Sequence, residues 1–452
     1  MSFPRYPEYK DSGVEWLGEV PAHWEIAPLK RAIARIESGT SVNAIDVPAA
    51  EHEYGVLKTS CVYDGEFDPS ENKAVVAEEY ERVTCSLRAG TLIVSRMNTP
   101  DLVGAAGLVR EAKEGLYLPD RLWQVHFSGT NPRFMHRWTQ SSQYRSQVQM
   151  ACSGTSASMQ NLAQDQFRAF LLALPPVNEQ AAIATFLDRE TAKIDALIAE
   201  QERLIELLKE KRQAVISHAV TKGLDPDVPM RDSGVEWLGE VPAHWDVVRL
   251  KFMATVQTGV AKGKDYSGRA TKSVPYLRVA NVQDGYLDLD DVATIEIPED
   301  EVDRYRLRAG DVLMNEGGDF DKLGRGHVWS GEREPCIHQN HVFAVRPNGV
   351  SSTWINLLTG SAYAQFYFMS RSKQSTNLAS ISSTNIMELP LLLPPSHEQE
   401  LIAAFARSEA NKCDDLVEAA ELAIAIFQER RAALISAAVT GQIDVRDAAP
   451  MR

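Results

Sequence analysis

The segment DSGVEWLGEVPAHW spans residues 11–24 and recurs without a change at residues 232–245. A second block, with the pattern Pro-Pro-x-x-Glu-Gln, starts at residue 175 and again at residue 394. Nearly half of the positions that follow it match between the two copies, as far as a shared Val-Thr pair. Self-similarity at a fixed spacing indicates a duplicated architecture. We therefore predict that the chain is an internal two-fold repeat.

Between these blocks the two copies diverge, although a common frame persists. Leu-Lys at residues 57–58 corresponds to Leu-Arg at 277–278, and Arg-Ala-Gly occurs at both 88–90 and 308–310. Gly and Pro separate short runs of residues that are typical of β strands, such as 91–95. We predict a mixed α/β globular domain in each copy.

Two long helices are predicted to follow these domains. The Pro-Pro pairs allow a helix to start afresh, and Gly223 and Gly441 stand just past the two helical runs, where helices commonly end. Apolar residues recur with a 3-4 spacing over about five heptads in each copy, which favours a coiled coil. The predicted seam is Ile183, Leu187, Ile194, Leu197, Leu204, Leu208 and Val215 in the first helix, and Ile402, Ala406, Cys413, Leu416, Ala420, Ala423, Phe427 and Leu434 in the second. The alternative is that each helix packs on its own globular domain.

An antiparallel pairing of the helices gives the repeat an approximate two-fold axis. Forty helical residues span about 60 Å, so the helices are expected to separate two similar domains and to set the distance between them. In this register Glu190 is expected to pair with Arg430, and Glu409 with Lys211. Such pairs would favour the antiparallel orientation. The predicted fold is thus mixed α/β, with two similar domains separated by two long antiparallel helices.

The repeat divides the chain into predicted segments. They are an entry motif at 1–24, a first variable domain at 25–174, a central helix at 175–222, a linker with the second entry motif at 223–245, a second variable domain at 246–393, a C-terminal helix at 394–440 and a tail at 441–452.

Bulk properties exclude several classes of protein. The net charge of −15 argues against a uniformly basic DNA-binding protein, although the local field at one groove matters more than the sum. No apolar run is long enough for a membrane span, and no signal peptide is visible, so a cytoplasmic protein is expected. Cys336, His338 and His341 lie close together but lack an obvious fourth ligand, and we predict no metal site.

Two patterns of this chain resemble motifs of type I restriction-modification specificity subunits. They are Trp-Leu-Gly-x-Val-Pro-x-x-Trp (16–24 and 237–245) and Leu-Pro-Pro-x-x-Glu-Gln-x-x-Ile-Ala-x-Phe (174–186 and 393–405). The duplicated order of motif, variable domain and helix is similar to that family over nearly the whole chain.

The resemblance implies a function without chemistry in this chain. Two target-recognition domains would each bind one half of a bipartite, asymmetric site in double-stranded DNA. Methyltransferase subunits, expected to be two, would dock against the antiparallel helices, and restriction subunits with ATP-driven translocase and nuclease activity would join them. S-adenosylmethionine, ATP and Mg are accordingly expected on the partner subunits, and no cofactor is expected in this chain.

Enzymatic alternatives find little support in the residues. The Pro-Pro pairs precede helices and do not form the Asn/Asp-Pro-Pro-Tyr/Phe motif of adenine methyltransferases. The glycines and lysines of residues 259–264 have the wrong spacing for a P-loop and lack its Ser or Thr. Residues 68–73 carry the acidic and lysine residues of a nuclease-like pattern in one copy only. The remaining alternative is a structural coiled-coil adaptor without base-specific DNA binding.

Candidate DNA contacts are polar side chains on loops and strand ends, because Arg, Lys, Asn and Gln read base edges and phosphates. For each single residue, a solvated surface charge or a turn former is an equally good interpretation. The candidates are Lys58, Arg96, Asn98 and Arg121 in the first domain, and Lys262, Lys264, Arg269, Lys272, Arg278, Asn281, Asn315, Gln339 and Asn340 in the second.

The repeated tryptophans have a different predicted role. Trp16, Trp24, Trp237 and Trp245 are identical between the copies, and what is identical cannot distinguish two different half-sites. We therefore predict that they pack as apolar anchors and do not stack on bases.

Overall fold

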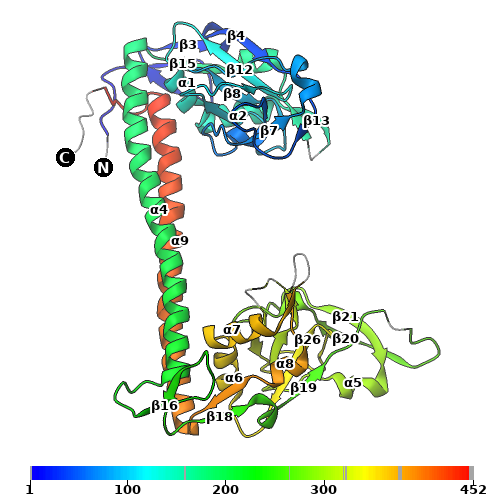
Figure 1. The fold of residues 1–452 in the computed structure, drawn as a ribbon. Coiled ribbons are helices and arrows are strands. Elements are labelled where there is room, and N and C mark those ends of the chain that lie inside the picture. Colours follow the sequence, from blue (N-terminus) through cyan, green and yellow to red (C-terminus); the bar gives the residue numbers. More distant parts are fainter. Residues whose placement is uncertain are drawn as a thin grey trace. The chain divides into compact units, whose positions relative to one another are not determined.

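The computed structural model describes residues 3–156, 159–263, 265–318, 320, 323–374 and 379–446. The chain forms two compact units, each of which is described by itself. Unit 1 contains residues 1–201 and 421–452, and unit 2 contains residues 202–420. Each unit holds one variable domain and one half of each long helix, α4 (Val177–Lys222) and α9 (Ser396–Val439) (Figure 1).

Unit 1 is built around a four-stranded sheet with the order β10-β8-β12-β4, in which all neighbours are antiparallel. A second sheet has the order β11-β6-β7-β5, and smaller sheets are β13-β14-β9, β15-β3 and β1-β2. The strands are β1 (Tyr9–Asp11), β2 (Glu19–Pro21), β3 (Glu25–Pro28), β4 (Ile33–Ser38), β5 (Ala44–Ile45), β6 (Gly55–Leu57), β7 (Asn72–Val75), β8 (Leu92–Ser95), β9 (Met97–Asn98), β10 (Ala106–Leu108), β11 (Leu116–Tyr117), β12 (Leu122–Phe127), β13 (Ser153–Ser156), β14 (Met159–Asn161) and β15 (Leu171–Leu174). The helices are α1 (Pro132–Thr139), α2 (Ser142–Ala151) and α3 (Gln164–Ala169).

Unit 2 repeats the central sheet as β24-β22-β26-β19, again antiparallel throughout. The other sheets are β21-β20-β25, β23-β28-β27, β18-β29 and β16-β17. The strands are β16 (Met230–Asp232), β17 (Glu240–Pro242), β18 (Asp246–Arg249), β19 (Ala254–Thr258), β20 (Thr271–Leu277), β21 (Ala293–Pro298), β22 (Val312–Asn315), β23 (Gly317–Gly318), β24 (Gly326–Val328), β25 (Ile337–His338), β26 (Val342–Pro347), β27 (Lys373–Gln374), β28 (Ala379–Ser380) and β29 (Pro390–Leu393). The helices are α5 (Glu299–Tyr305), α6 (Ser352–Thr359), α7 (Ala362–Arg371) and α8 (Ser383–Met387).

The common frame of the two units comes from matching local signals. Asn131 caps the start of α1 and Ser351 caps that of α6, because each side chain accepts a hydrogen bond from a free backbone N–H of the first turn. The strands β8 and β22 are buried along their whole length, as expected for the inner strands of a covered sheet. The mixed α/β domains predicted from the sequence are confirmed.

The long helices pair antiparallel in each unit. In unit 1, Ile183 at the start of α4 shares a core with Ile435 near the end of α9. In unit 2, Ile216 near the end of α4 shares a core with Ile402 at the start of α9. Each helix thus also packs on its variable domain, so the two alternatives considered from the sequence both describe part of the structure.

The predicted seam is wrong by one residue in its middle. Leu197, Leu204 and Leu416 are 40%, 40% and 51% exposed, whereas Ile205 is buried. Ile183, Leu187, Ile194, Leu208, Ile402, Ala406, Cys413 and Ala420 are buried as predicted, and Val215, Ala423, Phe427 and Leu434 are half-buried. The half-buried Ile198 and Val417 occupy the seam positions assigned to Leu197 and Leu416, because the alternation takes a four-residue step after Ile194 and Cys413.

The charge pairs predicted between the helices do not form. Glu190 pairs with Arg189 and Lys193 of its own helix, and Glu409 pairs with Lys412. Among the described residues, neither Glu190–Arg430 nor Lys211–Glu409 forms an ion pair, because Lys211 and Arg430 point to solvent beside the seam.

Two other pairs join the helices. Arg431 Nε lies 2.8 Å from Asp195 Oδ1 in unit 1, and Arg212 Nε lies 3.6 Å from Asp414 Oδ1 in unit 2. The repeat relates Asp195 to Asp414 and Arg212 to Arg431. Two opposite-charge pairs related by the repeat therefore exist, with the arginines one residue after the predicted cations and the aspartates five residues after the predicted glutamates.

Candidate nucleic-acid interface

The repeated entry motif anchors the N-terminus of a long helix in each unit. In unit 1, the indole N–H of Trp24 donates to Glu179 over 2.9 Å, and the ring of His23 lies 2.8 Å from the same carboxylate. Tyr6 also donates its hydroxyl to Glu179, over 2.6 Å. A carboxylate is stabilised in the first turn of a helix by the free N–H groups and the helix dipole. The entry motif and the Pro-Pro-x-x-Glu-Gln block are thus two halves of one contact.

Unit 2 repeats this contact. Trp245 donates to Glu398 over 2.7 Å, and His244 lies 2.6 Å from that carboxylate. Both Trp24 and Trp245 are fully buried, so the packing role predicted for them is confirmed. Trp16 and Trp237 are 39% and 40% exposed, and the Trp237 ring packs against Phe366 and Tyr367, so these two tryptophans are only partly buried.

The candidate arginines of unit 1 lie together at one end of the central sheet. Arg96 follows β8 and Arg121 precedes β12, and the Arg96 N–H donates to the Arg121 carbonyl over 3.0 Å. Arg121 is exposed, and Arg96 is half-buried with its Nε bonded to the Asp120 carbonyl. Lys58 lies between two carboxylates, 3.6 Å from Asp46 and 3.8 Å from Glu71.

The asparagine candidates are buried and are used by the fold. Asn98 donates to Tyr63 and to Ser95, and only 8% of it is exposed. The Asn281 side chain accepts from the Arg278 N–H and donates to two loop carbonyls. Asn315 is fully buried and donates to the Val282 carbonyl over 2.7 Å. Asn98, Asn281 and Asn315 are therefore not on the surface as predicted: Asn98 bonds to side-chain hydroxyls, and Asn281 and Asn315 bond to backbone carbonyls of loops.

The other candidates of unit 2 lie in three places. Lys262 and Lys272 are exposed, and Arg269 is held by Asp300 at 2.9 Å and by Glu301. Arg278 pairs with Asp291 at 2.8 Å. Gln339 and Asn340 are half-buried in the loop before β26, and Lys264 lies outside the described residues.

Residues that were not among the candidate DNA contacts occupy the matching end of the sheet in unit 2. Glu316 follows β22 and His341 precedes β26, and the Glu316 N–H donates to the His341 carbonyl over 2.9 Å. The backbone contact is the one made by Arg96 and Arg121 in unit 1. The side chains differ, since His341 Nδ1 lies 2.6 Å from the Glu316 carboxylate. The same backbone arrangement thus carries two arginines in unit 1 and a Glu–His pair in unit 2.

The three residues considered for a metal site belong to strand and loop contacts. His338 is fully buried, its Nδ1 lies 2.6 Å from the Val342 carbonyl, and burial lowers its pKa to about 4. Among the residues that the structure describes, no group of three or more His, Cys, Asp and Glu side chains is placed to hold a metal ion. Within the same residues, no helix combines the length and the apolar character that a membrane crossing requires.

The helices carry exposed apolar residues beside the seam. In unit 2, Leu204 of α4 and Leu416 of α9 each stand one residue before a seam position. Because the helices are antiparallel copies of one pattern, equivalent flanking positions face the same side of the pair. Leu197 of α4 and Ile426 of α9 are likewise exposed in unit 1. Exposed apolar residues on a surface helix mark a place where another apolar surface can bind.

Comparisons with known proteins agree with this arrangement. No family model matches the chain. The specificity subunit of the type I restriction enzyme EcoKI from Escherichia coli (strain K12) is 24% identical over 443 residues, which cover 94% of this chain and 90% of that protein. The StySPI specificity subunit from Salmonella potsdam is 22% identical over 396 residues, covering 84% of this chain and 81% of that protein.

Solved structures show the same fold. A structure from work on complex assembly and conformational transition of the type I R-M system has a TM-score of 0.62 at 17% identity, and covers 93% of this chain and 98% of its own. The HsdS subunit from Thermoanaerobacter tengcongensis has a TM-score of 0.50 at 17% identity with the same coverage.

The fold and its repeated anchors define a class of protein with two variable domains on an antiparallel helix pair. Within that class, the chain is similar along nearly its whole length to the specificity subunits of the type I restriction enzymes EcoKI and StySPI.

Proposed function

We propose that the chain reads a bipartite, asymmetric site in double-stranded DNA, one half-site with each variable domain. The observation that carries this proposal is the pair of matching sheet ends. The same backbone contact presents Arg96 and Arg121 in unit 1 but Glu316 and His341 in unit 2. A shared frame with different polar side chains at one place suits two readers of different sequences, since base edges are distinguished by their donors and acceptors.

The long helices also bind the partners of the chain. Two methyltransferase subunits dock on the helices, and the exposed Leu204 and Leu416 offer an apolar surface for them in unit 2. Restriction subunits bind to this complex of the chain and the methyltransferase subunits. The chain supplies recognition only, whereas S-adenosylmethionine, ATP and Mg bind to the partners. A cytoplasmic location follows from this role.

The negative net charge fits a chain that does not hold DNA alone. With a net charge of −15, much of the attraction for phosphates has to come from partner subunits. We therefore expect weak DNA binding by the isolated chain and strong binding by the assembled complex. An isolated chain that binds its site as tightly as the complex does would contradict this part of the proposal.

Mapping of methylated adenines tests the proposal. The chain and its methyltransferase partner are expressed in a cell without other adenine methylation, and the methylated sites are sequenced. We expect one motif with two defined halves and an undefined middle. A contiguous motif, or methylation that is independent of this chain, would favour the adaptor alternative instead.

A further inference from the structure

The first variable domain is fixed to α4 by an acidic residue. Asp188 of α4 accepts hydrogen bonds from Arg133 Nε and Arg137 Nε, both over 2.9 Å, and Arg110 NH1 lies 3.8 Å away. Arg137 is only 4% exposed, so this pair is removed from solvent on the side of the domain. Burial raises the pKa of Asp188, but the hydrogen bonds from Arg133 and Arg137 outweigh it and lower the pKa overall. The carboxylate therefore stays charged where the domain meets the helix.

The equivalent helix position in unit 2 carries the opposite charge. The repeat places Arg407 of α9 where unit 1 has Asp188. On the facing helix α6, Thr353 and Leu357 replace the two arginines of α1, and Ser330 replaces Arg110. Among the described residues, Arg407 forms no ion pair. No cationic side chain stands in unit 2 at any of the three positions where unit 1 has an arginine.

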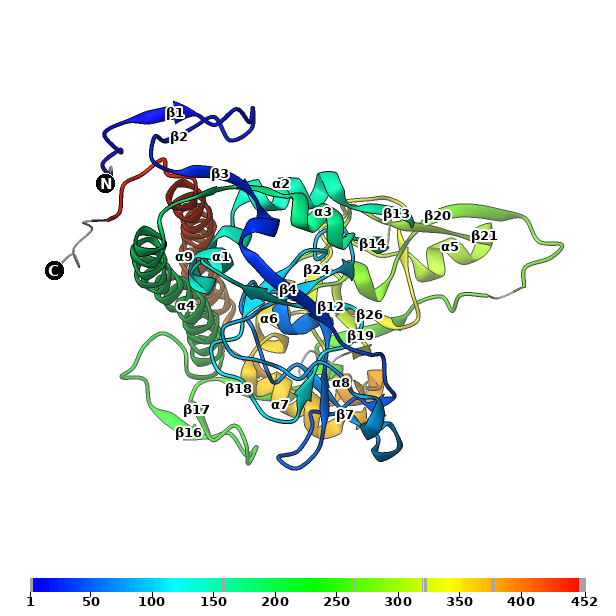
Figure 2. The same ribbon diagram turned by 90° about the horizontal axis from the view of Figure 1, so that it is seen from above.

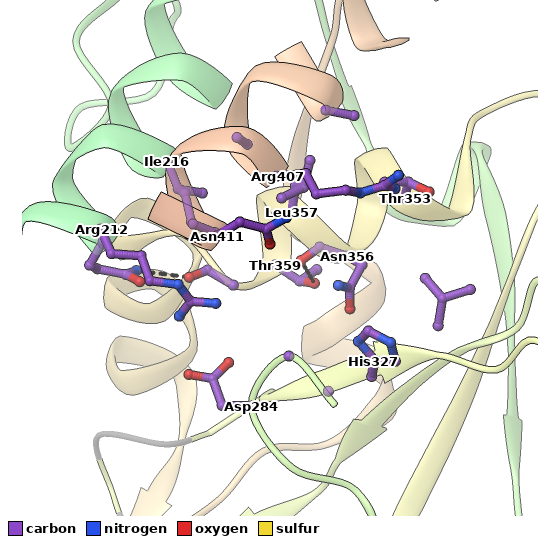
Figure 3. A pocket seen from close by; sticks show the side chains of 18 of the residues that line it. Arg212, Ile216, Asp284, His327, Thr353, Asn356, Leu357, Thr359, Arg407 and Asn411 are labelled. Atoms are coloured by element: carbon purple, nitrogen blue, oxygen red, sulfur yellow. Dashed lines mark hydrogen bonds between the residues drawn. The ribbon is translucent and has the colours of Figure 1, made fainter. Parts of the chain in front are cut away.

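The smaller side chains leave a cavity between the helices and the second variable domain. The cavity has a volume of about 440 Å³ and is lined by Arg407, Thr353 and Leu357 together with Asn356 and His327. Figure 3 shows Arg407 extending across this cavity toward Thr353. In unit 1 the aligned positions carry the three arginines whose guanidinium groups surround Asp188.

We infer that the charge at this helix position selects which variable domain can dock at each position of the chain. A domain with the arginines of α1 needs the carboxylate of Asp188, and Arg407 would repel it. A domain with the uncharged residues of α6 accepts Arg407 but would leave the Asp188 carboxylate without its partners. Removing one partner of a largely buried ion pair is strongly destabilising. The inference concerns docking within the chain and does not depend on what the domains bind.

A domain duplication tests this inference in the full-length chain. Residues 25–174 are placed at both positions, once with the native Arg407 and once with Arg407→Asp. We expect the Arg407→Asp chain to unfold at a midpoint higher by about 5 °C. We also expect amide hydrogen exchange in the second copy of α1 to be as slow as in the first copy. Equal midpoints, or a more stable chain with Arg407, would overturn the inference.

The native arrangement supplies a matched control. Arg407→Asp in the native chain is expected to change the unfolding midpoint by less than about 2 °C, because Thr353 and Leu357 carry no charge. Asp188→Arg is expected to lower it by about 5 °C or more and to speed amide exchange in α1. If both reversals have the same effect, charge at this position does not distinguish the domains. This comparison decides the question even if the duplicated chain does not fold.

Discussion

Replacing Glu179 by Ala is expected to destabilise unit 1 much more than Glu398→Ala destabilises unit 2. The Glu179 carboxylate accepts from the buried Trp24 indole and the buried Tyr6 hydroxyl, in addition to the more exposed His23. Glu398 serves one buried donor, the Trp245 indole, and an exposed histidine. A buried donor left without a partner costs about 1–3 kcal/mol.

The magnitudes follow from counting buried donors. Glu179→Ala leaves two of them, so the expected loss is about 4 kcal/mol, against about 2 kcal/mol for Glu398→Ala. For domains of this size these losses lower the unfolding midpoint by about 12 °C and about 6 °C. Glu179→Gln keeps one acceptor oxygen and is expected to fall between the native chain and the Ala variant.

Thermal unfolding followed by amide hydrogen exchange measures both effects. Exchange in the paired strands β3 and β15 reports on unit 1, and exchange in β18 and β29 reports on unit 2. The two variants are matched, since each removes the same carboxylate from the same helix position. A loss for Glu398→Ala that equals or exceeds that for Glu179→Ala would refute the reasoning from buried donors.

Three further predictions concern the helices. Leu204→Asp combined with Leu416→Asp is expected to abolish co-purification with the methyltransferase and to leave the unfolding midpoint nearly unchanged, because both side chains are exposed; retained assembly would exclude this flank as the docking surface. Inserting about four residues near Gly223 is expected to lengthen the undefined middle of the methylated motif with both halves intact, and an unchanged spacing in an active variant would contradict the role of this junction. Asp195→Arg is expected to lower the unfolding free energy by up to about 1 kcal/mol, and adding Arg431→Asp should restore part of it; a double variant less stable than the single one would mean that the pair does not act across the helices.

Much of the architecture could be predicted because the repeat constrains it. Two identical entry motifs and two matching helix starts require the same local structure twice, and the buried contact of Trp24 with Glu179 explains why both are preserved. The first and last described segments of the chain also lie together. In unit 1 the Asp444 N–H donates to the Pro4 carbonyl over 2.8 Å, and Figure 2 shows the first and last described segments on the same side of the unit.

The middle of the helix seam could not be fixed from the sequence. Leu197 and Ile198 are both apolar, so composition allows either in the seam, and only the four-residue step after Ile194 selects the isoleucine. The ion pairs between the helices also differ from the prediction, since they involve Asp195 and Arg212 where Glu190 and Lys211 were expected. An error of one residue on a helix turns a side chain by about 100°, which is enough to exchange a buried position for an exposed one.

The candidate DNA contacts could be predicted less well than the helix seam, because the same residue types bind DNA and stabilise buried loops. Asparagine reads bases, but it also replaces missing backbone hydrogen bonds in buried loops, as Asn281 and Asn315 do. Glu316 and His341 were missed as DNA contacts because the candidates were limited to Arg, Lys, Asn and Gln side chains. The signal that could have found them is the alignment of the two frames, which places them at the positions of Arg96 and Arg121.

The exchange of one variable domain tests the central claim most directly. Residues 25–174 are replaced by the same region of a related chain, and the methylated adenines are mapped in cells that contain the methyltransferase partner. The account predicts that one half of the methylated motif changes, whereas the other half keeps its sequence. A change in both halves, or in neither, would contradict the claim that each domain reads its own half-site.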